Sequence, residues 1–196
     1  MQPWQFFEKS VGAWTIESAR SQFRYPLASG ESLEGPAREY FYYLRAALDA
    51  LCELFTPRRL EWPPGSVLLK SYSPLAPGEM ERQLRAAWTN GQLGALVGGL
   101  ARAHIKEEGK VLLVEIPDAL RFALEGAGDR YVITLATNCD LWLERTVSGE
   151  DNAEAGSLNA AALGHAILRL ESALDGRVIS YSTEIDGVRA GPAGFS

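Results

Sequence analysis

The chain has 196 residues, of which 46% are apolar and 22% charged, as in an ordinary globular protein with a substantial buried core. Its formal net charge of −6 argues against a nucleic-acid-backbone binder, which needs clustered Lys and Arg, and Arg58-Arg59 is the only adjacent basic pair. Two cysteines, Cys52 and Cys139, are too few for a disulfide framework or a structural zinc site.

The N-terminal segment MQPWQFFEKSVG lacks the basic and long apolar regions of a signal peptide. No run of residues approaches the roughly 18 apolar positions that a membrane-spanning helix needs. We therefore expect a cytoplasmic protein without a membrane-bound part. Arg greatly outnumbers Lys, and Ala and Gly are abundant, which suggests a bacterial gene of high GC content.

The first part of the chain predicts one strand and one long helix. Residues 4–10 could form a helical turn, and residues 14–25 alternate partly, as a strand does. After Pro36, residues 38–55 predict an amphipathic helix. Its apolar stripe comprises Tyr40, Phe41, Leu44, Ala47, Leu48, Leu51 and Phe55, with Cys52 on or beside it as a small hydrophobe. Pro57 and Pro63-Pro64 then predict irregular structure before a strand at residues 66–73.

The middle of the chain is interpreted as mostly helical. Pro77-Gly78 starts a predicted helix at residues 79–90, and residues 92–106 could resume as a short helix that contains glycines. Residues 110–116 (KVLLVEI) predict a buried strand because of their apolar run, and Pro117 predicts a short helix over residues 118–126.

The last third predicts two strands, a helix and a closing strand. The two strands flank Asn138-Cys139-Asp140, with Leu135 and Leu143 facing the core. A helix follows over residues 151–176, capped by Asp151 or Ser157 and ended by Gly176. Residues 177–185 alternate as a strand, Asp186-Gly187 form a turn, and a Gly/Pro-containing tail follows. The predicted helix stripe consists of Leu163, Ala166, Ile167, Leu170 and Leu174.

This order mixes hairpins and helices without a regular strand–helix alternation, which predicts an α+β fold. We expect a mixed or antiparallel sheet packed against two or three amphipathic helices. The chain is interpreted as a single domain over residues 1–196, with residues 106–110 as the place where a subdivision could fall.

Asn138-Cys139-Asp140 raises the question of a catalytic tip. A cysteine nucleophile needs a histidine base, and the two candidates are His104 and His165. His165 is predicted to face solvent, and His104 has no acidic neighbour before Glu107. Asn and Asp favour tight turns, so we interpret the segment as the corner of a hairpin. No catalytic residue, metal ligand or cofactor site is predicted elsewhere.

The glycines in the segment 91–99 invite comparison with a phosphate-binding loop. A P-loop needs Lys-Ser/Thr after its last glycine, but Leu100-Ala101 follow here, and a dinucleotide-binding loop needs G-x-G-x-x-G after a strand. We interpret these glycines as sites of close helix approach or as a flexible connector. Ligand binding by this segment stays open.

Two acidic segments and one tryptophan are the candidate partner-binding residues. Glu107-Glu108 and Glu150 lie in turn-like contexts, and Trp62 stands between Glu61 and Pro63-Pro64. An acidic protein without visible chemistry is typical of modules that cover a basic partner, because opposite charge steers association. The expected function is therefore non-catalytic protein binding, of the immunity-protein, inhibitor or chaperone type.

Two terminal segments carry a resemblance to a known family. FFEKSVGAWTIES resembles the start of the S-type phycobiliprotein lyases, which open with F-F-x-x-S-x-G-x-W, and SYSTEI is similar to their closing S-F-x-S-E-I strand. The matched segments cover about 20 of the 196 residues. The resemblance implies a lipocalin-like barrel that carries a bilin chromophore, which is the alternative function.

Overall fold

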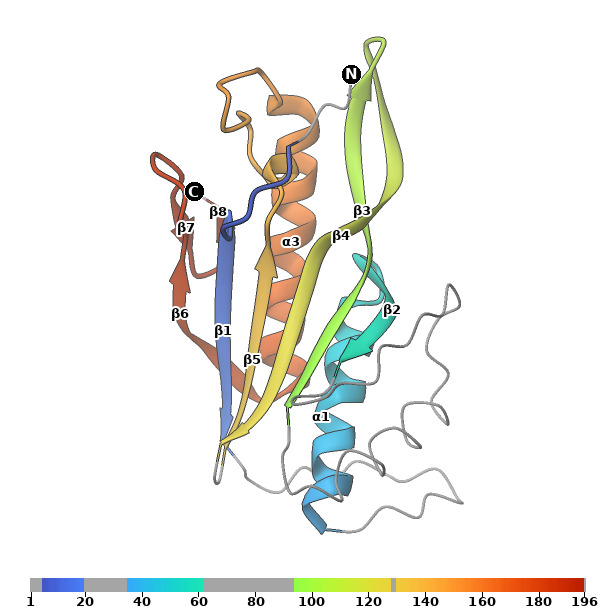
Figure 1. Ribbon diagram of the computed structural model, residues 1–196, viewed down its shortest axis with the longest axis vertical. Helices are drawn as coiled ribbons and strands as arrows, with labels where there is room; N and C mark the ends of the chain where they lie inside the picture. Colours follow the sequence, from blue (N-terminus) through green and yellow to red (C-terminus); the bar gives the residue numbers. More distant parts are fainter. Residues whose placement is uncertain (1–4, 20–34, 62–93, 128–129, 196) are drawn as a thin grey trace.

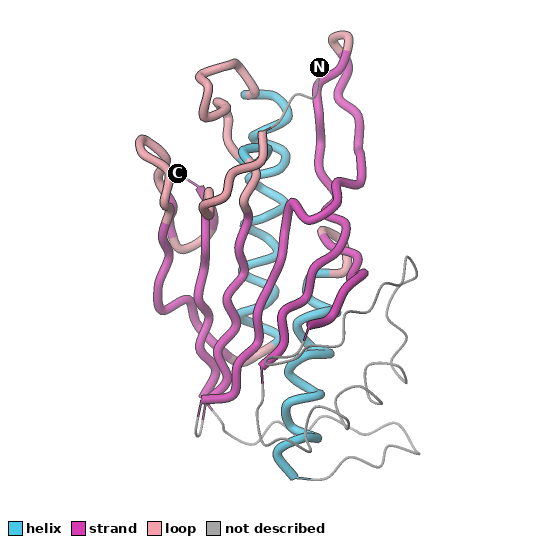
Figure 2. Tube along the Cα trace, in the orientation of Figure 1, coloured by secondary structure: helices cyan, strands magenta, loops and turns pink. Residues whose placement is uncertain are grey.

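The fold is a six-stranded antiparallel sheet with two long helices on one of its faces (Figure 1; Figure 2). The computed structural model describes residues 5–19, 35–61, 94–127 and 130–195. The predicted α+β class, with an antiparallel sheet and two helices, is thus confirmed. In the sheet order β2-β3-β4-β5-β1-β6 the strands are β2 (Phe55–Glu61), β3 (Gly94–Glu107), β4 (Lys110–Ala127), β5 (Arg130–Thr137), β1 (Gly12–Ala19) and β6 (Gly176–Ser182).

The helices are α1 (Gly35–Leu51) and α3 (Ala153–Ala173), and both bury an apolar stripe against the sheet. The stripe predicted for α3 is confirmed, since all five of its residues are buried, and Tyr40, Leu44, Ala47 and Leu51 of α1 are buried too. The Tyr40 hydroxyl donates to the Leu124 carbonyl at 2.8 Å, and the Ser18 hydroxyl donates to the Leu174 carbonyl at 2.6 Å. None of the helices in the described ranges is long and apolar enough to span a membrane.

The prediction for residues 52–61 is wrong. Helix α1 ends at Leu51, Cys52 is exposed, and Phe55 opens the edge strand β2. Pro57 fits there because an edge strand does not need every N–H, and the pairing with β3 shifts register between Pro57 and Arg59. The strand predicted at residues 66–73, the helix predicted at 79–90, and Trp62 lie outside the described residues.

The two helices predicted at residues 92–106 and 118–126 are strands instead. Residues 94–107 form β3, and β4 continues through Pro117 to residue 127. The strand absorbs the proline at an irregularity of the β3–β4 pairing, where Asp118 adopts a left-handed φ of 55°. The predicted role of the glycines in helix approach or as a connector is therefore wrong for Gly99. It allows two strands to approach closely, since a Cβ there would collide with the Thr56 carbonyl oxygen of β2.

Both chain ends also differ from expectation. Residues 5–10 contain no helical turn, and Phe6 instead makes an isolated bridge with Cys139. The C-terminal segment forms a small hairpin of β7 (Ala190–Gly191) and β8 (Gly194–Phe195). Its Phe195 packs edge-on against Trp14, with ring centroids 5.1 Å apart. The described strands form an open sheet with edges at β2 and β6, rather than the barrel that the resemblance implied.

The start and end of α3 differ from the predicted signals. Asn152 occupies the N-cap position, where neither Asp151 nor Ser157 does, although Asp151 Oδ1 accepts a hydrogen bond from Ala153 N at 3.2 Å. At the other end Asp175, with φ 46°, turns the chain, and Gly176 already begins β6.

Candidate functional site: the upper end of the sheet

The segment around Cys139 is buried, and it is not the corner of a hairpin. After β5 ends at Thr137, the chain enters the short 3-10 helix η1 (Asp140–Trp142), and residues 138–146 form no second strand. Cys139 is fully buried, and this burial raises the pKa of its thiol to about 12. A thiol that keeps its proton at neutral pH is a poor nucleophile.

Thr137 is the centre of a buried hydrogen-bond network beneath η1. Its hydroxyl accepts a hydrogen bond from Trp142 Nε1 at 2.6 Å and donates to the Ala119 carbonyl at 2.8 Å. The same oxygen accepts from Cys139 N at 3.2 Å. Since Thr137 and Trp142 are both buried, this network holds η1 in one position against β4 and β5.

Asp140 ties two distant segments to η1. Its fully buried carboxylate accepts hydrogen bonds from Gln5 N at 2.9 Å and from Val147 N at 3.1 Å. Hydrogen bonds of this kind to a charged acceptor are among the stronger ones in proteins. The N-terminal segment and the loop before α3 are thereby fixed to the same end of the molecule.

Asn159 of α3 covers part of the edge of β3. Its side-chain Oδ1 accepts from His104 N at 2.6 Å, and its Nδ2 donates to the His104 carbonyl at 2.8 Å. The Asn159 amide thus satisfies both backbone groups of His104, as a neighbouring strand would. It also donates to the Leu141 carbonyl at 2.8 Å, which joins β3, α3 and η1.

The β3–β4 hairpin tip and the loop before α3, which carry the predicted acidic residues, lie at the same end of the molecule, uppermost in Figure 1, although they are far apart in the sequence. Glu107 and Glu108 form the tip of the β3–β4 hairpin, and Glu150 lies in the loop before α3. An ion pair of 2.9 Å between Lys106 Nζ and Glu154 Oε2 joins the hairpin tip to the start of α3. The hydrogen bond from Lys106 to Glu154, together with the negative charge of Glu154, raises the pKa of Lys106. Trp62, the fourth candidate, lies outside the described residues.

The outer part of this hairpin, residues 101–117, projects beyond the end of β5, and we call it the ribbon (Figure 1). Leu112 and Leu113 on the ribbon are 40% and 63% exposed, so the predicted burial of KVLLVEI is wrong for its two leucines. Adjacent strand residues point to opposite faces, and each face of the ribbon therefore carries one exposed leucine. Sequence reasoning missed this surface because a run of apolar residues normally marks a buried strand.

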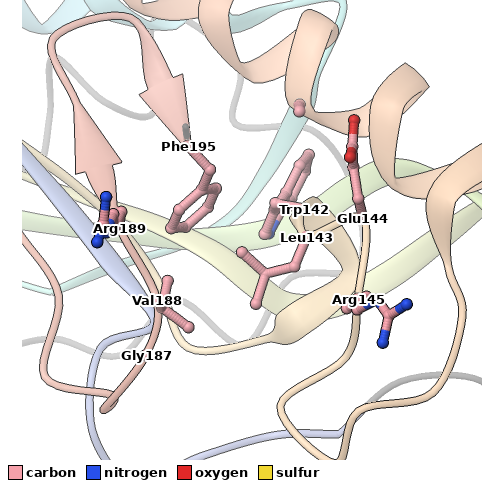
Figure 3. A pocket seen from close by; sticks show the side chains of 9 residues that line it. Trp142, Leu143, Glu144, Arg145, Gly187, Val188, Arg189 and Phe195 are labelled. Atoms are coloured by element: carbon pink, nitrogen blue, oxygen red, sulfur yellow. The ribbon is translucent and has the colours of Figure 1, made fainter.

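A cavity of about 420 Å³ lies between the segment after η1 and the C-terminal hairpin (Figure 3). Trp142, Leu143 and Phe195 give it apolar walls, and the exposed residues Arg145 and Arg189 lie on opposite sides of it. The charged groups of the lining are these two arginines and the carboxylate of Glu144. The remaining lining residues are Ala160, Gly187 and Val188.

Within the described ranges, no group of three or more His, Cys, Asp or Glu side chains is arranged to hold a metal ion. Comparison with protein-family models, with curated proteins and with solved structures gave no significant match to this chain.

Proposed function

We propose that this protein is a non-catalytic protein-binding module, of the inhibitor, immunity-protein or chaperone type, and that it binds a basic partner protein. The observation that carries the proposal is the exposed ribbon, with Leu112 and Leu113 in its β4 strand, beside the acidic residues of the same end. Exposed apolar surface next to charged residues is typical of protein–protein interfaces.

The apolar part of this surface would contribute binding energy. Burying a fully exposed leucine contributes about 1.5–3 kcal/mol, and Leu113 offers more of its surface than Leu112. Because the two leucines lie on opposite faces of the ribbon, a partner that covers one face would bury one of them.

The acidic part would determine the partner and speed its association. Glu107, Glu108 and Glu150 are exposed and form no ion pair with any other residue in the described part of the chain. They are thus available to the Lys and Arg residues of a partner. Complementary charge of this type raises association rates more than it raises affinity, and salt screens it.

The test is a charge reversal at Glu150, measured against a partner captured from native lysate and purified. Glu150→Lys should slow association several-fold at low salt and flatten the dependence of the rate on salt. Glu125→Lys is the matched control, because Glu125 is exposed near the opposite end of β4. Equal association rates for the two variants would contradict a role for the acidic end.

A small-ligand carrier is the second candidate, and the cavity beside Trp142 supports it. Its two arginines could pair with carboxylates of an apolar ligand, such as the bilin-type chromophore that the resemblance implies. The two segments that carry this resemblance are adjacent, since Glu184 N donates to the Ser10 carbonyl at 3.1 Å. A visible spectrum of the purified protein, followed by titration with biliverdin, tests this function. Binding that Arg145→Gln and Arg189→Gln leave unchanged would argue against the cavity as the ligand site.

A further inference from the structure

We infer that the free edge of β4, over Lys110–Ile116, binds an extended basic segment of a partner protein as an added strand of the ribbon. This inference rests on the proposed function and specifies how the partner would be held. Strand addition of this type uses backbone hydrogen bonds for affinity and side-chain contacts for specificity.

The two edges of the ribbon differ in whether their backbone N–H and C=O groups have hydrogen-bond partners. On the β3 side, the Asn159 amide satisfies both backbone groups of His104. On the β4 side, β5 pairs with Leu120–Ala127, and the Thr137 hydroxyl satisfies the Ala119 carbonyl. Beyond that point, no described strand pairs with β4 on its outer edge (Figure 1).

The free edge has defined limits. At one end Glu108 and Gly109 form the hairpin turn, with φ angles of 49° and 76°. At the other end Pro117 has no N–H to donate, and Asp118 leaves the extended conformation with φ 55°. Between them lie the residues of KVLLVEI, a length close to that of an average strand.

The composition of this edge is unusual for an uncovered strand. Natural proteins protect edges with charged residues, prolines or bulges, because bare edges pair with other chains. Here the charged residues and prolines are Lys110, Glu115 and Pro117, and four consecutive apolar residues, Val111–Val114, lie between Lys110 and Glu115. An added strand would cover the backbone groups and place its side chains beside Leu112 and Leu113.

The charges next to the edge specify the occupant. Glu107 and Glu108 at the ribbon tip are exposed and lack ion-pair partners in the described ranges. Within the edge itself, Lys110 is the one cation and Glu115, which pairs with Arg102, is the one acid, so the two unpaired glutamates at the tip decide the sign. A strand with apolar residues and several Lys or Arg residues would therefore fit better than an acidic one. A second copy of this chain is a poorer occupant, since each copy carries a net charge of −6.

The experiment uses a labelled synthetic peptide of alternating valine and lysine, long enough to span the edge, and measures its affinity by fluorescence anisotropy. A second peptide has the same side chains, with alternate backbone amides N-methylated so that it cannot pair as a strand. We expect the first peptide to bind, to protect alternate amides of Lys110–Ile116 from hydrogen exchange, and the second to bind at least tenfold more weakly.

The variants locate the site. Leu113→Thr keeps a strand-forming residue and should weaken the first peptide about tenfold, which corresponds to about 1.4 kcal/mol. Ile179→Thr is the matched control, because Ile179 is an exposed apolar residue on the opposite edge strand, β6. The control should leave the affinity unchanged.

The outcomes separate this inference from the proposed function. Equal binding of both peptides, weakened by Glu107→Gln and Glu108→Gln, would overturn strand addition and leave a charge-based interface in place. Failure of both peptides to bind would overturn the inference, and an unaltered association rate for Glu150→Lys would separately overturn the proposed function. Self-association in sedimentation velocity that Leu113→Thr abolishes would make a second copy the occupant and would overturn the basic partner.

Discussion

Replacing Thr137 with valine should destabilise the protein strongly, because the hydroxyl of this one residue serves three buried groups. Valine has nearly the same shape as threonine but cannot form hydrogen bonds. The substitution would leave Trp142 Nε1–H, Cys139 N–H and the Ala119 carbonyl without their threonine partner.

The size of the effect follows from the cost of an unsatisfied buried polar group, about 1–3 kcal/mol each. The shortest of the three bonds, at 2.6 Å, belongs to Trp142, which is fully buried and cannot turn to solvent. We therefore expect Thr137→Val to reduce the free energy of unfolding by about 3–5 kcal/mol. This would be a large share of the roughly 5–15 kcal/mol by which such proteins are stable.

Two further variants separate the hydroxyl from the methyl group. Thr137→Ser keeps the oxygen and should cost about 1 kcal/mol for the lost methyl group. Thr134→Val changes a partly exposed threonine of the same strand and should stay within about 0.5 kcal/mol of the wild type.

Urea denaturation followed by far-ultraviolet circular dichroism measures the free energy of unfolding of all three variants. The comparison holds where the slope of that free energy against urea concentration is the same as in the wild type. If Thr137→Val and Thr134→Val differ by less than about 1 kcal/mol, the Thr137 network is not a major source of stability.

Further predictions concern the cysteines, a glycine and helix α1. The thiol of Cys139 keeps its proton up to a pKa of about 12 in the folded protein, but loses it near pH 9 when unfolded. Stability should therefore fall as pH rises through this window, by up to about 1.4 kcal/mol per unit, and Cys139→Ala should show a shallower fall in pH-dependent denaturation. At neutral pH, mass spectrometry after iodoacetamide treatment should find exposed Cys52 modified and buried Cys139 unmodified. Gly99→Ala should cost about 1–3 kcal/mol of unfolding free energy in urea, because its methyl group meets the β2 backbone. In the same assay Leu51→Ala should cost about 2–5 kcal/mol, and exposed Asp49→Ala no more than about 0.5 kcal/mol.

The elements that sequence reasoning predicted well are those whose pattern is local. In α3 the spacing from Leu163 to Leu174 places five apolar residues on one face, and all five are buried. The pattern in α1 is equally regular as far as Leu51. A helix needs only its own residues to form its hydrogen bonds, so the period of the sequence is enough to identify it.

Strands β3 and β4 could not be identified in the same way, because their partners are distant in sequence. Residues 94–107 are rich in Ala and Leu, which favour helices, and Pro117 resembles a helix start. Leu120, Phe122 and Leu124 do alternate toward the core, which is a strand signal. The proline outweighed that signal in the sequence, whereas the protein accommodates it at a pairing irregularity.

For the candidate site, the sequence indicated the acidic residues but not their common location. Glu107 and Glu150 lie at the same end of the molecule because β3 is long enough to reach the start of α3, where Lys106 pairs with Glu154. Leu112 and Leu113 were missed because an apolar run looks the same whether its strand is buried or uncovered. Only the length of the neighbouring strand decides between the two.

That length is set by the residues around Cys139. Strand β4 has 18 residues, but β5 has only 8 and stops at Thr137. There the Thr137 hydroxyl, in place of a further backbone N–H of β5, donates a hydrogen bond to the Ala119 carbonyl of β4. The Asp140 carboxylate, which accepts from Gln5 N and Val147 N, holds the following residues in η1. The Asn138-Cys139-Asp140 segment would therefore contribute to the proposed function through the length of β5. By ending β5 early, it leaves the edge of β4 uncovered where the partner segment is proposed to bind.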